Sequence, residues 1–154
     1  MIVLGIDPGS KRIGYGLIEK TGGKLKLIEA NLLIHPKNLL EIKNQVSFLI
    51  EKFSPEYLAV EKVFFSKNRK TALEVSEARG VIILSALEKN LPIREFTPNE
   101  VKSAVAGYGL ASKKAVAKMV RLTLNEPTLK VIDDVSDALA IAITATSKLL
   151  KNLD

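Results

Sequence analysis

The sequence predicts an α/β fold in which a five-stranded mixed sheet is flanked by helices on both faces. Two observations support this prediction. Three short apolar segments at the start of the chain, separated by turn signals, are typical of an antiparallel meander. Beyond residue 38, helical and strand patterns alternate, which is typical of parallel strands joined by helices. Functional sites in such sheets form at the carboxyl ends of strands.

Each element is predicted by its own local pattern. The pair Gly22-Gly23 is a hairpin signal between the second and third strands, and apolar residues at helical spacing mark the helices. Thr97 is a good N-cap for a helix with Pro98 at its first position. We expect strands at residues 1–6, 13–19, 24–34, 57–61 and 91–96. We expect helices at residues 38–53, 70–89, 98–106, 113–124 and 133–149.

Composition limits the class of protein. The chain has 154 residues, of which 47% are hydrophobic and 26% charged, so we expect a single globular domain over residues 1–154. It has no cysteine, which excludes disulfides and thiol-based sites. We find no signal segment or membrane-spanning run and expect a cytoplasmic protein with no membrane partner. The net charge of +6 favours a polyanionic partner without establishing one.

Four carboxylates stand at positions that the predicted fold brings together. Asp7 ends the first strand and Glu61 ends the fourth, so both lie at one edge of the sheet if these strands are adjacent and parallel. Asp134 and Asp137 are three residues apart, which places them on one face near the start of the last helix. The residues that follow them are apolar enough to bury that helix.

Each of these acids also has an ordinary structural explanation. Asp7 precedes Pro-Gly and could form a turn, Asp134 could cap a helix, and Glu61 could be a surface residue. Four neighbouring carboxylates, however, repel one another unless cations neutralise them. Hard oxygen donors without histidine or cysteine select magnesium or manganese, and two such ions would balance the four charges. Two ions about 4 Å apart are the usual arrangement for phosphodiester cleavage.

These residues belong to four longer segments, which occur in the order GIDPGSKRIGYG, VEKVFFSKN, EARG and DDVSDALAIA. Together the segments resemble the RuvC family of crossover (Holliday) junction endodeoxyribonucleases, and the similarity runs from residue 2 to about residue 146. The resemblance implies a ribonuclease H-like fold and a homodimer. It also implies magnesium-dependent nicking of two opposed strands of a four-way DNA junction, during recombination and repair.

The same resemblance assigns residues and partners. The family's four catalytic, metal-binding acids fall on Asp7, Glu61, Asp134 and Asp137, with two magnesium ions per site and manganese as a substitute. The branch-migration complex of RuvA and RuvB is implied as a partner. One segment, LLIHPKNLLEIKNQV, looks shorter than its usual form in the family and lies away from the acids. We interpret its His35 as a surface or loop residue rather than a metal ligand.

A first basic set follows the fourth strand. A basic loop with adjacent aromatic residues suits binding of a DNA backbone together with stacking on bases. The resemblance indicates Phe64 as a residue that stacks on an unpaired base near the crossover, whereas the alternative is that this side chain belongs to the core. We expect DNA contacts from Phe64, Lys67, Arg69 and Lys70.

A second basic set flanks the loop at residues 107–109. Lys102 and Lys113 match family positions that approach the DNA backbone near the metals. Lys113 and Lys114 also follow the N-cap Ser112, where backbone N–H groups can add to a phosphate site. We expect DNA contacts from all three lysines. Lys118 and Arg121 extend this set, with a solvated helix face as the competing explanation.

The long helix predicted at 70–89 carries small and apolar residues at helical spacing, which allows another element to approach closely. Packing on the sheet explains this pattern, and the resemblance suggests that the region also helps to form the dimer.

Other functions are compatible with parts of the sequence. GSKRIG also resembles the YqgF-type nucleases that act on ribosomal RNA precursors, although that family lacks the EKVFF and DDVSDALAIA patterns. A non-catalytic module that binds DNA junctions would keep only the basic face, but four acids weaken DNA binding unless metal is present. GIDPGS also resembles the phosphate loop of actin-like sugar kinases, but 154 residues leave no room for their second lobe.

Overall fold

A computed structural model describes residues 1–62 and 69–148. Within these residues, five strands form one sheet in the order β3-β2-β1-β4-β5. The strands are β1 (Ile2–Pro8), β2 (Ile13–Thr21), β3 (Lys24–Leu32), β4 (Tyr57–Glu61) and β5 (Ile93–Phe96). The helices are α1 (Leu39–Phe53), α2 (Arg69–Glu88), α3 (Pro98–Ala106), α4 (Lys113–Thr123) and α5 (Asp133–Lys148).

The sheet is mixed, as the sequence predicts. β2 pairs antiparallel with both β1 and β3, whereas β4 pairs parallel with both β1 and β5. The expected bounds differ from the observed ones by a few residues. β1 continues through Asp7 to Pro8, so Asp7 lies within the strand, opposite Gly14 of β2, rather than at its end. β5 begins only after Pro92, which lacks the N–H that a strand interior uses.

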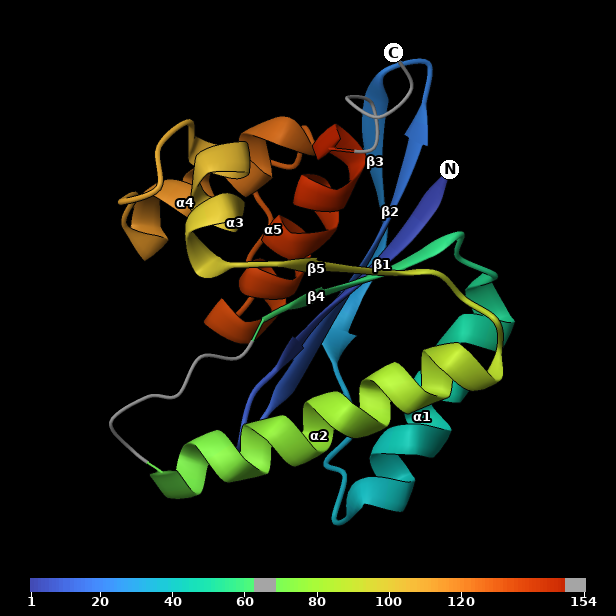
Figure 1. Cartoon of the computed structure of the whole chain (residues 1–154). Coiled ribbons are helices and arrows are strands. Elements are labelled where there is room, and N and C mark those ends of the chain that lie inside the picture. Colours follow the sequence, from blue (N-terminus) through green and yellow to red (C-terminus); the bar gives the residue numbers. More distant parts are fainter. Residues whose placement is uncertain (63–68, 149–154) are drawn as a thin grey trace.

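Helices cover both faces of the sheet, which confirms the predicted layers (Figure 1). α1 and α2 pack on the face that presents Leu4, whereas α3, α4 and α5 lie on the face that presents Val3. These two residues enter different cores because neighbouring side chains of a strand point to opposite faces. Each of β1's central residues is therefore buried, which explains why the strand reads as an unbroken apolar run.

α5 lies unusually close to the backbone of β1 and β2. A Cβ atom at Gly5 would lie 2.3 Å from the carbonyl oxygen of Ala138, and one at Gly14 would lie 2.1 Å from that of Asp134. Neither distance is possible for a real side chain, so glycine is required at both positions. This contact brings the first turn of α5 over the strand that carries Asp7.

Local signals for the helices are confirmed in detail. The Thr97 side chain accepts a hydrogen bond from the N–H of Glu100, whose carboxylate accepts one from the N–H of Thr97, so α3 begins with a capping box. Ser112 caps α4, and His35 is an exposed loop residue as expected. Among the described helices, none combines the length and apolar character needed to cross a membrane.

Candidate active site

The candidate site lies where β1 and β4 end side by side. Ile6 is paired with Val60 across these two parallel strands. The next residues along the strands are Asp7 and Glu61, which therefore occupy the same edge of the sheet. The adjacency and direction of the two strands, which the sequence analysis could only assume, are thus correct.

α5 adds two more acids, Asp134 and Asp137, to this edge. Burial of Asp7, together with the negative charges of Asp137, Glu61 and Asp134, raises the pKa of Asp7 from 3.8 to about 7, against the opposing effect of Lys113. All three other acids are therefore close enough to act on Asp7. The structure brings the four predicted carboxylates together, with three of them around the half-buried Asp7 of β1.

Glu61 shares this environment. Its pKa is raised by burial and then by the charge of Asp137, whereas Lys102 and Lys113 lower it. The two lysines come from α3 and α4, so they place positive charge beside the acids from a separate part of the chain. Acids and lysines together can hold both a cation and the phosphate groups that a cation would bind.

An open pocket of about 320 Å³ joins these groups. Its charged lining consists of Asp7, Glu61, Asp137, Lys102 and Lys113, and its apolar lining includes Val101 and Val116. Asp134 is not part of this lining, although it lies near enough to affect Asp7.

Two ion pairs hold the acids that α5 contributes. Lys113 Nζ lies 3.1 Å from Asp137 Oδ2 and donates a hydrogen bond to it. Arg12 Nε lies 3.0 Å from Asp134 Oδ2, but without hydrogen-bond geometry, so this buried oxygen accepts no hydrogen bond from any described residue. Sequence reasoning did not select Arg12, because its contact exists only once α5 has docked on β2.

The donor set fits a hard divalent ion, since it consists of carboxylate oxygens and includes one buried oxygen without a hydrogen bond. As the side chains stand, however, no three acids or histidines in residues 1–62 and 69–148 are arranged so that they could hold a metal ion. In this arrangement Lys113 and Arg12 each pair with one carboxylate of α5.

Arg79 of α2 braces the other side of the site and was also missed. Its Nε donates a hydrogen bond of 3.0 Å to the carbonyl oxygen of Glu61, and its terminal nitrogen pairs with Glu95 of β5. The side chain is only 19% exposed. The signal in the sequence was the EARG segment, to which no role could be given without knowing what α2 contacts.

The predicted DNA contacts have different outcomes. Lys102 and Lys113 line the pocket, whereas Lys114 and Lys70 are exposed outside it. Phe64 and Lys67 lie outside the described residues. Arg69 begins α2, and its side chain is not described either.

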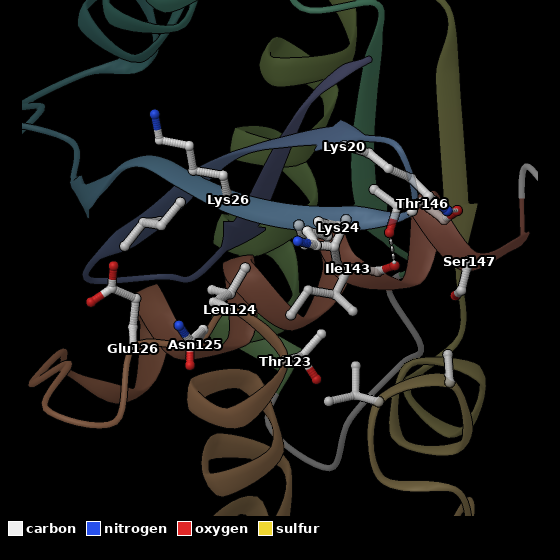
Figure 2. A pocket seen from close by; sticks show the side chains of 15 residues that line it. Lys20, Lys24, Lys26, Thr123, Leu124, Asn125, Glu126, Ile143, Thr146 and Ser147 are labelled. Atoms are coloured by element: carbon white, nitrogen blue, oxygen red, sulfur yellow. Dashed lines mark hydrogen bonds between the residues drawn. The ribbon is translucent and has the colours of Figure 1, made fainter.

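A larger pocket of about 890 Å³ lies at the far end of the molecule (Figure 2). It is lined by the hairpin of β2 and β3, by parts of α3, by the end of α4 with the residues after it, and by the C-terminal half of α5. The candidate site lies instead at the first turns of α5, which carry Asp134 and Asp137. Lys20 Nζ donates a hydrogen bond to the carbonyl oxygen of Thr146 there, which complements the negative end of the helix dipole. Among the described residues that line it, Glu126 is the only acid, so residues 1–62 and 69–148 place no cluster of carboxylates there.

The fold is ribonuclease H-like and is shared with solved DNA-junction resolvases. Thermus thermophilus RuvC in complex with a Holliday junction substrate superposes with a TM-score of 0.91, at 33% identity, over 99% of this chain and 96% of that one. The yeast mitochondrial Holliday junction resolvase superposes with a TM-score of 0.64, at 17% identity, over 98% of this chain and 83% of that one, which indicates a common fold.

Sequence comparison agrees and is more specific. The family model of crossover junction endodeoxyribonuclease RuvC matches residues 3–145. The proteins of that name from Chloroflexus aurantiacus and Halothermothrix orenii are each 46% identical to this chain, over 93% of it and 91% and 90% of their own lengths. The chain belongs to the RuvC family.

The raised pKa of Asp7 predicts a pH-dependent stability in the absence of metal. The folded protein keeps the Asp7 proton up to about pH 7, whereas the unfolded chain loses it near its ordinary pKa of 3.8. Stability conferred by the bound proton is therefore lost as the pH rises through this window. Asp7→Asn should raise the free energy of unfolding at pH 8 by on the order of 2 kcal/mol and change it little below pH 4.

Urea unfolding with a chelator present, at a series of pH values, measures this difference. Asp133→Asn is the matched control, because Asp133 is an exposed acid on the same end of α5 that does not line the pocket. Equal effects of the two substitutions at every pH would show that the site does not destabilise the ionised Asp7.

Proposed function

We propose that this protein is a structure-selective endonuclease that resolves four-way DNA junctions by paired, magnesium-dependent nicks in opposed strands. The observation that carries the proposal is the convergence of three carboxylates on Asp7, in a chain that belongs to the RuvC family. Thermus thermophilus RuvC, whose structure this chain resembles, was solved in complex with a Holliday junction substrate. Homologous recombination and DNA repair are the processes that generate such junctions.

Each acid has a role in this proposal. Asp7, Glu61, Asp134 and Asp137 would hold two divalent ions, magnesium in the first place and manganese as a substitute. When bound, such ions activate water and stabilise charge on the phosphate oxygens. Because the four acids stand on a strand edge and a buried helix, they would hold such ions on rigid elements.

Basic residues position the DNA. Lys102 and Lys113 reach the pocket from α3 and α4, so they can bind the phosphates on either side of the bond that is cut. Lys114 and Lys70 are exposed beyond the pocket and would extend the contact along the backbone. Phe64, Lys67 and Arg69 remain proposed contacts from the segment after β4, with Phe64 stacking on an unpaired base. Such phosphate contacts supply affinity and register rather than sequence preference.

Two copies of the chain would meet through α2. The buried face of this helix carries Ala78 and Ile82. The opposite face carries Gly80 and three exposed leucines. The leucines are Leu73, Leu84 and Leu87, with exposed fractions of 62%, 47% and 59%. A Cβ atom at Gly80 would find no described atom within 4 Å, so a second helix can approach closely there. A two-fold dimer would direct two active sites at symmetry-related strands of one junction.

The cellular setting follows the relatives. We propose that residues 1–154 act as one nuclease domain in the cytoplasm, with the RuvA and RuvB branch-migration complex as a partner. The two competing functions, cleavage of ribosomal RNA precursors and binding of junctions without cleavage, are outcomes that the first experiment below separates.

The first test is nicking of an immobile four-way junction, with a linear duplex and a structured RNA precursor as comparison substrates. The wild-type protein should cut only the junction, symmetrically and only with magnesium or manganese. Asp7→Asn should abolish cutting while junction binding persists, because the substitution removes a metal ligand and a negative charge. Binding without cutting by the wild-type protein would favour a junction-binding module, and cutting of RNA alone would favour the ribosomal function.

Lys102 can be tested through the salt dependence of binding. Removing one phosphate contact should weaken junction binding and lower the slope of log affinity against log salt by about 1. Fluorescence anisotropy with Lys102→Ala measures both quantities. Lys24→Ala is the matched control, since Lys24 lies on the hairpin at the far end of the sheet. An unchanged slope in Lys102→Ala would remove this residue from the phosphate contacts.

The dimer can be tested at Leu84. Leu84→Glu places a charge in the proposed interface and should convert a dimer into monomers in sedimentation equilibrium, because burying an unpaired charge is unfavourable. Leu40→Glu serves as the control, because Leu40 is also well exposed but lies on α1. Dimers of undiminished strength in Leu84→Glu would place the interface elsewhere.

A further inference from the structure

Arg12 stands in an unusual place for a basic residue of this site. It lies on the turn between β1 and β2, and its Nε is 3.0 Å from Asp134 Oδ2. Asp134 is one of the four acids of the proposed metal site. The guanidinium thus pairs with the carboxylate that a divalent ion would need, and it serves as that carboxylate's counter-ion.

The contact between Arg12 and Asp134 is a close ion pair that lacks hydrogen-bond geometry. The Asp134 oxygen is buried yet accepts no hydrogen bond from the described residues, so Arg12 neutralises it without engaging it as a donor. The Arg12 side chain is 57% exposed, whereas that of Asp134 is 22% exposed. Arg12 can therefore swing into solvent at little cost, while the acid stays on a helix that cannot retreat from the sheet.

Packing supports this difference in mobility. Asp134 lies in the first turn of α5, and its carbonyl oxygen touches the backbone at Gly14. An arginine guanidinium is a permanent cation near neutral pH, so a divalent ion must compete with Arg12 for this carboxylate. The neighbouring Lys11 is exposed and makes no ion pair within the described part of the chain.

We propose that Arg12 is a positioning residue that holds Asp134 in the metal-free protein and is displaced when a divalent ion takes that carboxylate, so that Arg12 sets the metal affinity of this position. The inference rests on the proposed metal site. It has a direction that is opposite to that of a metal ligand: removing Arg12 should tighten metal binding rather than weaken it.

Isothermal titration calorimetry with Mn²⁺ in the absence of DNA tests the proposal. Arg12→Gln should bind Mn²⁺ about three- to fivefold more tightly at one position than the wild-type protein, the scale of a partly exposed ion pair. Lys11→Gln removes the same charge one residue away and controls for the general field of the protein. It should change the affinity less than Arg12→Gln does.

A double-substitution cycle identifies the partner. In an Asp134→Asn background, Arg12→Gln should leave the remaining Mn²⁺ affinity unchanged, because the two residues act through one contact. Thermal unfolding gives an independent readout: Mn²⁺ should raise the melting temperature of Arg12→Gln more than that of the wild-type protein. Circular dichroism is used before titration to check that Arg12→Gln, Asp134→Asn and the double variant are folded.

The outcomes separate this inference from the proposed function. Mn²⁺ binding by the wild-type protein, lost in Asp7→Asn but unchanged or weakened in Arg12→Gln, would overturn the role of Arg12 and leave the metal site intact. Equal tightening in Arg12→Gln and Lys11→Gln would reduce the effect to net charge and also overturn it. Absence of Mn²⁺ binding by the wild-type protein would overturn both the metal site and the role of Arg12.

Discussion

The contact between α5 and the backbone of β1 and β2 is the constraint on which the site depends. Gly5 and Gly14 leave no room for a Cβ atom beneath the helix, so helix and sheet approach as closely as two backbones can. Since α5 is buried along most of its length, its first turn cannot shift without disrupting the core. Two acids on the helix are thereby held over two acids on the strands, which is an arrangement that electrostatics alone would oppose.

That opposition explains the charges around the acids. Burial and repulsion together raise the pKa of Asp7 to about 7, so ionising all the carboxylates at once is unfavourable in the metal-free site. Protein cations relieve part of the strain: Lys113 pairs with Asp137, and Arg12 pairs with Asp134. The acids of α5 are therefore compensated by basic side chains, and Asp7 is stabilised by the nearby charge of Lys113. In the proposed function, divalent ions would compensate all four carboxylates.

The sequence predicted most of the fold and the acids because both rest on local patterns. Strand runs, the N-cap Thr97 and the three-residue spacing of Asp134 and Asp137 can be recognised within a few neighbouring residues. Arg12 and Arg79 could not be recognised in this way, since each acts on an element distant in the sequence. The predicted end of the first strand lies two residues before the observed end of β1, because a proline such as Pro8 can still occupy the terminal position of a strand.

Arg79 gives α2 a second consequence. The helix presents its leucines outward, while from its inner side Arg79 grips the last carbonyl of β4 and a carboxylate of β5. A displacement of α2 along its axis would therefore pull on the strand end that carries Glu61. In the proposed dimer, the crossing geometry of the two α2 helices would set the distance between the two active sites. A junction would have to adopt a shape in which its two cleaved strands are separated by that distance.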